Sequence, residues 1–241
     1  MNTLHNFLFN VYPYVCLSVF LMGSLARFDR DQYTWKSDSS QLLRASQLRW
    51  GSNLFHGGIL FLFFGHLFGQ LTPHGLYTMF MTSSQKQLLA VVAGGLAGGA
   101  CFIGLTMLLH RRLFDPRIRL TSHRTDIAIL IILWVQLVIG LSTLPASLHH
   151  VADPQTMLRL AEYLQGIALL QPDAALVDGI AWHFQVHMLL GMTIFLLFPF
   201  SRLVHVWSGL ASVAYLFRPY QVVRARRLNV PAGQNQPRRA G

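Results

Sequence analysis

The chain has 241 residues, of which 53% are hydrophobic and only 12% are charged. About a quarter of the residues of a soluble domain are charged, so this composition is too apolar to cover a water-facing globule. The formal net charge is +10. The basic residues lie in separate stretches between apolar runs, without a soluble domain to present them, so we expect no nucleic-acid partner.

Five apolar segments are long enough to cross a membrane, which takes about 20 residues for about 30 Å of hydrocarbon. In chain order they are roughly 4–26, 51–71, 87–109, 125–145 and 182–207. We therefore predict an all-α, multi-pass bundle of five transmembrane helices surrounded by membrane lipid. The first segment lacks a basic leader and an Ala-x-Ala site, so we expect it to remain as a structural helix.

The connections between these segments differ in positive charge. The four connections and the C-terminal tail hold five, one, five, one and six Lys or Arg residues, in that order. Positive residues collect on the cytoplasmic side of a membrane. The pattern thus places the N-terminus outside and the C-terminus in the cytoplasm. Residues 1–227 form the predicted membrane domain, and the polar tail 228–241 is expected to be disordered.

The fourth connection is long and is expected to contain a short helix. Asp153 and Pro154 are typical of a helix start. Apolar residues then recur at helical spacing: Met157, Leu158, Ala161, Leu164 and Ile167. We predict an amphipathic helix that lies on the outer surface or on the bundle.

Histidines give the strongest functional signal. Four of the eleven lie within or at the edge of the second and fifth segments: His56, His66, His187 and His205. An ionisable residue inside a span is costly and marks a candidate functional site. An interhelical hydrogen bond would satisfy a single histidine, but four histidines on two helices favour a cofactor. Haem b fits, because it sits between facing helices with an imidazole on each side of the iron.

Depth in the membrane selects the histidine pairs. At 1.5 Å per residue, His66 lies about 24 Å and His187 about 22 Å from the inner boundary, so these two match. His56 then pairs with His205 by elimination, nearer the cytoplasm. The second match is poorer, because the separation along the helix is about 15 Å on the second segment and about 27 Å on the fifth. Helix tilt and a kink at Pro199 would absorb much of this difference.

Small residues flank the histidines of the second segment. They are Gly57, Gly58, Gly65 and Gly69. Such glycines would leave room for a macrocycle, or would let another helix pack closely. The two cysteines form no Cys-x-x-Cys motif, which excludes iron–sulfur clusters and covalently attached haem.

Several short strings together resemble one family, the gamma (cytochrome b) subunit of respiratory nitrate reductase, over about residues 1–227. The strings are Tyr12-Pro13-Tyr14, Gln32-Tyr33-Thr34-Trp35, Ser52-Asn53-Leu54-Phe55-His56, Gly65-His66, Leu71-Thr72-Pro73-His74, Arg111-Arg112-Leu113-Phe114, Gly191-Met192-Thr193 and Pro199-Phe200-Ser201-Arg202-Leu203. The resemblance implies a membrane anchor and electron-transfer subunit in the bacterial inner (cytoplasmic) membrane.

The resemblance also implies cofactors and partners. Two b haems are expected, an outer one held by His66 and His187 and an inner one held by His56 and His205. Quinol would be oxidised near the outer haem, beside His66 and Lys86. Electrons would pass to an iron–sulfur beta subunit, and nitrate would be reduced on a molybdopterin-containing alpha subunit.

Positively charged residues have two interpretations. Lys86 borders the quinol site in the family, but a lone lysine there would also serve as an interfacial anchor that reaches for water. Arg27, Arg112 and Arg202 lie at inner helix ends. They would pair with propionates of the inner haem, or act as ordinary positive-inside anchors.

Two other functional classes remain open from the sequence. The chain would also suit the diheme anchor of another quinone-linked enzyme, such as a formate dehydrogenase or a hydrogenase. A transporter would use the histidines as a proton relay. A copurifying partner that reduces nitrate would distinguish a nitrate reductase subunit from the anchor of another quinone-linked enzyme. A purified protein without haem would favour the transporter.

The predicted orientation is testable with reporter fusions. Fusions after Arg44, Arg119 and Arg227 should report the cytoplasm, and fusions near Gly75 and Asp153 should report the outside, because the positive connections stay inside. A reversed pattern would contradict the orientation. A pattern that makes the second and fifth helices parallel would also remove the depth match between the histidines.

Overall fold

The computed structural model describes residues 2–30, 45–120 and 122–207. Within these ranges the regular structure is entirely helical, and five helices are long and apolar enough to cross a membrane. The predicted all-α bundle of five spans is thereby confirmed. The string from Gln32 to Trp35, the boundary at residue 227 and the tail 228–241 all lie outside the described residues.

The first span is formed by α1 (Thr3–Asn6), a π-helical turn η1 (Phe7–Val11) and α2 (Tyr12–Arg30). The next three are α3 (Ala45–Leu71), α5 (Ser83–Phe114) and α7 (Arg124–His149), and the fifth begins with α9 (Trp182–Leu197). The first four helices run past the predicted apolar segments, because polar residues continue a helix beyond the hydrocarbon at little cost. At the start of α5, a capping box between Thr82 and Gln85 fixes the first turn.

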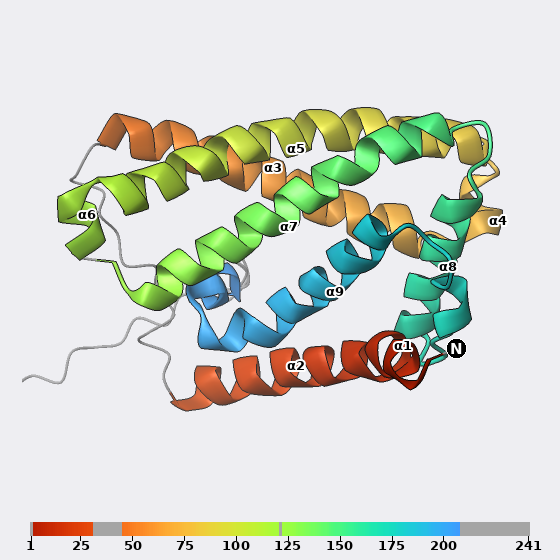
Figure 1. The fold of residues 1–241 in the computed structure, drawn as a ribbon, viewed down its shortest axis with the longest axis horizontal. Coiled ribbons are helices and arrows are strands. Elements are labelled where there is room, and N and C mark those ends of the chain that lie inside the picture. The colour runs from red at the N-terminus through yellow and green to blue at the C-terminus, as the bar shows by residue number, and fades with distance from the viewer. Residues whose placement is uncertain (1, 31–44, 121, 208–241) are drawn as a thin grey trace, which may run out of the picture.

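The long helices pack in a continuous order: α3 against α5, α5 against α7, α7 against α9, and α9 against α2 (Figure 1). One end of the bundle carries α4 (His74–Tyr77), α8 (Gln155–Ala168) and η3 (Ala174–Leu176), and we call it the outer end. The opposite end carries α6 (Pro116–Leu120) and is called the inner end. The names follow the predicted orientation, which the structure itself does not test.

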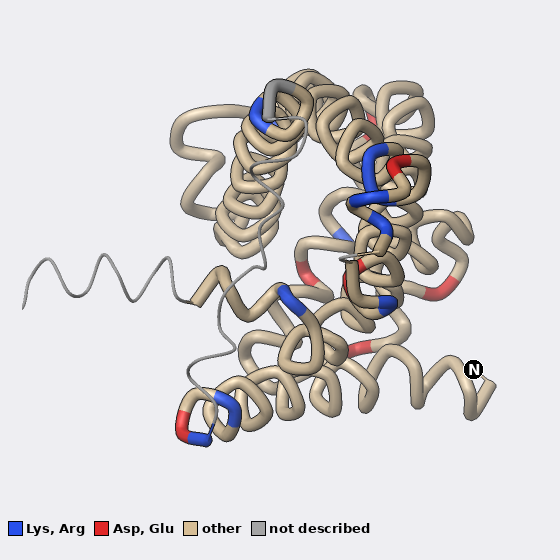
Figure 2. The backbone as a smooth tube through the Cα atoms, turned by 90° about the vertical axis from the view of Figure 1, so that its left-hand side faces the viewer, with Lys and Arg blue, Asp and Glu red and all other residues tan. Residues whose placement is uncertain are grey.

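Arginines collect at the inner end, as the sequence pattern requires. Figure 2 shows the bundle from this side, with Lys and Arg in blue. They occupy the last turns of α2, α5 and α6. This distribution agrees with the positive connections on which the predicted topology is based.

Glycines set the spacing between α3 and α5. A Cβ atom added to Gly58 would lie 2.7 Å from the Cβ of Cys101, and one added to Gly104 would lie 2.7 Å from the carbonyl oxygen of Gly51. The two helices are therefore antiparallel and nearly touch. Gly58 thus serves helix packing, whereas added Cβ atoms at Gly57, Gly65 and Gly69 would meet nothing within 4 Å.

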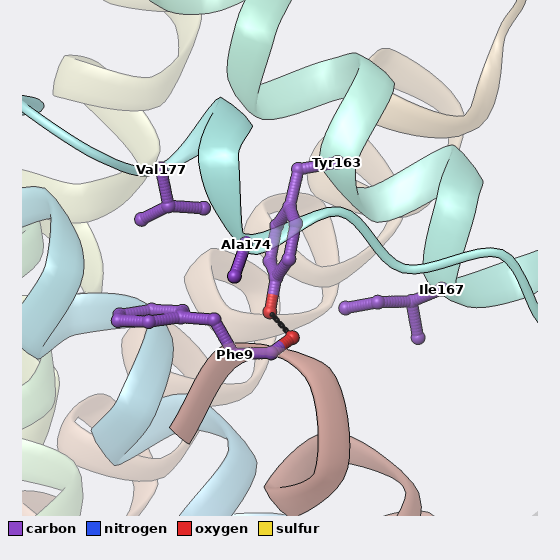
Figure 3. Packing of buried hydrophobic residues seen from close by; sticks show 5 residues of the cluster. All are labelled: Phe9, Tyr163, Ile167, Ala174 and Val177. Atoms are coloured by element: carbon purple, nitrogen blue, oxygen red, sulfur yellow. Dashed lines mark hydrogen bonds between the residues drawn. The ribbon is translucent and has the colours of Figure 1, made fainter. Parts of the chain in front are cut away.

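The predicted amphipathic helix after Pro154 is confirmed as α8, which lies at the end of the bundle that we call the outer end. Its Tyr163 is only 1% exposed and donates its hydroxyl to the carbonyl oxygen of Phe9 at 2.7 Å. These two residues pack with Ile167, Ala174 and Val177 (Figure 3). Burial raises the pKa of Tyr163 well above its usual value, so the hydroxyl stays protonated and can donate. The hydrogen bond ends on the π-helical turn of the first span, where a widened backbone leaves carbonyl groups available.

The fifth span is not one continuous helix, so the prediction of a single kinked helix over 182–207 was wrong in this respect. α9 ends at Leu197, and two 3-10 turns follow, η4 (Phe198–Phe200) and η5 (Arg202–Val204). Pro199 lies in the first of these turns. Proline lacks the backbone N–H that an α-helix needs, and its ring clashes with the preceding turn. The helix therefore stops before it, and the backbone turns.

Candidate functional site

The structure brings the four intramembrane histidines together in two pairs. The ring centroids of His66 and His187 are 6.2 Å apart, and those of His56 and His205 are 6.3 Å apart. In each pair one ring comes from α3 and the other from the fifth span. These are the pairs that the depth argument selected, so the poor match in helix length is resolved by the fold.

Hydrogen bonds orient three of the four rings. The Nδ1 atom of His66 donates to the carbonyl oxygen of Leu62 at 2.7 Å. His56 donates in the same way to Ser52 at 2.8 Å, and His205 to Arg202 at 2.6 Å. A carbonyl oxygen only accepts, so the proton sits on Nδ1 in each ring. The Nε2 atom is then the unprotonated nitrogen, which is the form that binds a metal.

His187 is held differently, by packing against α7. Its Nδ1 atom is buried and has no hydrogen-bond partner in the described part of the chain. A Cβ atom on Gly140 would lie 2.7 Å from its Cε1 atom. The side-chain amide of Gln136, one turn before Gly140, donates to the backbone oxygen of His187 at 3.0 Å. Neither residue was predicted from the sequence, although a lone glutamine within an apolar segment is a usable signal.

The separation of the rings can be tested against haem. A ring nitrogen lies about 1.1 Å from its ring centre and binds a first-row metal at about 2.0–2.1 Å. Two imidazoles on opposite sides of one iron therefore have ring centres about 6.3 Å apart. Both histidine pairs agree with this value. No described group of three or more His, Cys, Asp or Glu would bind a bare metal ion, and a haem iron needs only two protein ligands because the porphyrin supplies four nitrogens.

A buried charge cluster lies at the inner end beside the second pair. The Asp126 carboxylate, in the first turn of α7, is 3.4 Å from Arg112 and 3.3 Å from Arg202. Arg112 also donates to the hydroxyl of Ser122 at 3.0 Å. Asp126 was not among the sequence candidates, although it is an acidic residue among positive neighbours. Two guanidinium groups thus contact one carboxylate close to His205.

Lys86 lies in a small polar group at the outer end. Its ammonium nitrogen is 3.7 Å from the centre of the Tyr77 ring, which is a cation–π contact. The Tyr77 side chain is 7% exposed, and its hydroxyl is 2.9 Å from the hydroxyl of Ser83. The ammonium is therefore folded over a buried ring. The α3–α5 register, with Gly58 beside Cys101, places Lys86 about two helical turns further out than His66.

Comparison with known proteins identifies the family. A family model described as nitrate reductase gamma subunit matches residues 5–226. The chain is 48% identical over 227 residues to the respiratory nitrate reductase 1 gamma chain of Escherichia coli (strain K12), which covers 94% of this chain and 100% of that relative. It is 37% identical over 221 residues to the nitrate reductase gamma chain of Bacillus subtilis (strain 168), covering 91% and 97%. The chain belongs to the nitrate reductase gamma subunit family.

Family membership decides between the alternatives that the sequence left open. As a nitrate reductase gamma subunit, the chain is the membrane anchor of a respiratory enzyme complex that also contains catalytic and other subunits. The five apolar helices agree with a multi-pass, membrane-bound subunit. The comparison favours this assignment over a formate dehydrogenase or hydrogenase anchor and over a transporter.

Proposed function

We propose that this gamma subunit oxidises quinol near the outer end of the bundle and passes the electrons through two b haems. The electrons would go to an iron–sulfur beta subunit, and nitrate would be reduced on a molybdopterin-containing alpha subunit. The observation that carries the proposal is the separation of the two histidine pairs, 6.2 and 6.3 Å between ring centroids. Two unrelated pairs of side chains have the spacing that one iron between two imidazoles requires.

His66 and His187 would hold the outer haem, and His56 and His205 the inner one. When bound, the two haems would supply one-electron carriers at two depths of the membrane. The protein fixes the ligand orientation through the backbone acceptors of three rings and through Gly140 beside the fourth. Hydrogen bonds of this kind raise the basicity of an imidazole ligand and hold its plane.

The arginines at the inner end suit the carboxylates that a haem carries. Arg112 and Arg202 would pair with propionates of the inner haem, which is one of the two interpretations of these arginines given by the sequence. Both share the single carboxylate of Asp126. Guanidinium groups bind carboxylates through charge-assisted hydrogen bonds, which supports the binding of a propionate at this place. Asp126 would then hold the two guanidinium groups in position and reduce their mutual repulsion.

Lys86 is the candidate quinol-site residue. Oxidation of a quinol releases two electrons and two protons, and a hydroxyl that deprotonates needs a hydrogen-bond partner. An ammonium group favours the deprotonated oxygen by charge and by donation. The contact with Tyr77 supports this role over that of an anchor extended to water, because it keeps the ammonium against the bundle. The position about two turns beyond His66 would place the protons near the outer boundary.

Substitution of Gly140 tests the outer haem ligation. Gly140→Ala should weaken or displace the outer haem, because the new methyl group would overlap the His187 ring and move it from His66. Mutation of the groups that support a metal ligand typically costs about 10–100-fold in metal affinity, and displacement of the ring should cost at least as much. The low-spin signals of both haems in the purified complex measure the effect.

Gly99→Ala is the matched control, because an added Cβ there meets nothing within 4 Å. Alanine is also the better helix former by about 1 kcal/mol, so this variant should retain both haems. Equal haem content and unchanged spectra in the Gly140 variant would contradict ligation by His187.

Substitution of Lys86 tests the quinol site. Lys86→Ala should slow reduction of the haems by a quinol analogue, because the deprotonating oxygen loses its donor, while both haems stay bound. Haem reduction is followed directly by stopped-flow absorbance, since an artificial donor that acts on the soluble subunits would bypass this chain.

Dithionite provides the control, because it should reduce both haems of the variant fully. Tyr77→Phe keeps the ring beneath the ammonium. The quinol analogue should therefore reduce the haems of this variant at the original rate. Unchanged quinol kinetics in Lys86→Ala would leave the lysine as an interfacial anchor.

A further inference from the structure

The first span carries none of the four histidines, yet it holds the break in the fifth span. The guanidinium Nη1 of Arg27, near the end of α2, donates to the carbonyl oxygen of Pro199 at 2.7 Å and to that of Ser201 at 3.1 Å. Both carbonyl groups belong to the segment in which the α-helix is interrupted. A guanidinium group is a planar fork with several donors, so it can bind two neighbouring acceptors at once.

Steric fit adds a second, uncharged contact between α2 and the break. A Cβ atom on Gly23 would lie 2.8 Å from Cγ and 2.9 Å from Cβ of Pro199. The proline ring is rigid and cannot move aside as a flexible side chain would. Only glycine at this position lets α2 approach the break so closely.

Contacts beyond the break fasten the segment that follows His205. The indole N–H of Trp207 donates to the hydroxyl of Ser24 at 3.2 Å. The ring of Phe20 packs against those of Phe198 and Trp207, with centroids 4.9 and 5.6 Å apart. The chain on both sides of His205 is thus attached to the same face of α2.

The break is what allows His205 to face His56. A continuous helix would carry residue 205 about 27 Å from residue 187, whereas the two histidines of α3 are about 15 Å apart along their helix. The two 3-10 turns after Leu197 replace this straight path, and His205 caps the second of them. The ring separation of 6.3 Å in the inner pair therefore depends on the geometry of the break.

We propose that Arg27 and Gly23 are positioning residues for the inner haem site, acting through the break at Pro199. The proposal rests on the proposed haem ligation by His56 and His205. It gives Arg27 a role that differs from the propionate contact expected from the sequence. The guanidinium group of Arg27 binds main-chain carbonyl groups of the break. Gly23, which carries no charge, gives α2 the space to pack against the same break.

The test compares four variants of the complete complex: Gly23→Ala, Arg27→Lys, Arg27→Gln and the control Arg30→Gln. The readouts are the low-spin ferric signal and the midpoint potential of each haem. Gly23→Ala and both Arg27 variants should alter the signal and potential of the inner haem, or lower its binding by about tenfold or more. The outer haem should remain unchanged, and Arg30→Gln, which removes the same charge from the exposed end of α2, should affect neither haem.

If Gly23→Ala and Arg27→Lys both leave the signal and potential of the inner haem unchanged, Arg27 acts through its charge and the positioning role is refuted. If a variant loses both haems together, the bundle as a whole has failed and selective positioning is also refuted. If the unaltered complex contains two haems and none of the variants changes them, the positioning role is refuted but the proposed function is not. If the unaltered complex contains no haem, both the proposed function and the positioning role are refuted.

Discussion

Histidine rings inside a membrane need a partner for each nitrogen, and this requirement organises the bundle. Water is absent from the hydrocarbon, so an unpaired polar group there costs several kcal/mol, about 2–7 by common reference states. In three of the four rings the helix backbone satisfies Nδ1. The rings of each pair lie 6.2 and 6.3 Å apart between centroids, one from α3 and one from the fifth span. Iron between the rings would bind one nitrogen of each, and in the proposed function it does so at two depths.

The two helices that carry the histidines are positioned indirectly. α3 packs closely on α5 through Gly58 and Gly104, and α9 lies between α7 and α2. Among the five spans, α3 and the fifth are the least buried by the rest of the chain. Their distance from each other is therefore set by α5, α7 and α2, and two of these helices, α7 and α2, contribute residues that contact a histidine or the turn before it. Gly140 on α7 lies against His187, and Arg27 on α2 holds the turn before His205.

The sequence was sufficient for the features that depend on composition and spacing. Five apolar runs predicted the five spans, and apolar residues at helical spacing after Pro154 predicted α8. Histidine depth selected the pairs that the structure brings together. The continuity of the fifth span was predicted wrongly, because the effect of Pro199 depends on whether a neighbouring helix supports a full break. Here Gly23 and Arg27 provide that support, from more than 170 residues away along the chain.

The roles of Asp126, Gln136 and Gly140 could not be assigned from the sequence for the same reason. Each acts on a residue of another helix: Asp126 on Arg112 and Arg202, the other two on His187. Spacing along one helix shows which residues share a face, but it does not show which side chain of another helix contacts that face. The Lys86 contact with Tyr77 is of this kind as well, since it joins α5 to the short helix α4.

The central claim is that each histidine pair holds one haem. It is tested most directly by replacing the four histidines one at a time and recording the reduced-minus-oxidised spectrum and haem content of each purified complex. If each pair holds one haem, the His66 and His187 variants should lose the same haem, and the His56 and His205 variants should lose the other. Loss of different haems from the His66 and His187 variants would contradict it.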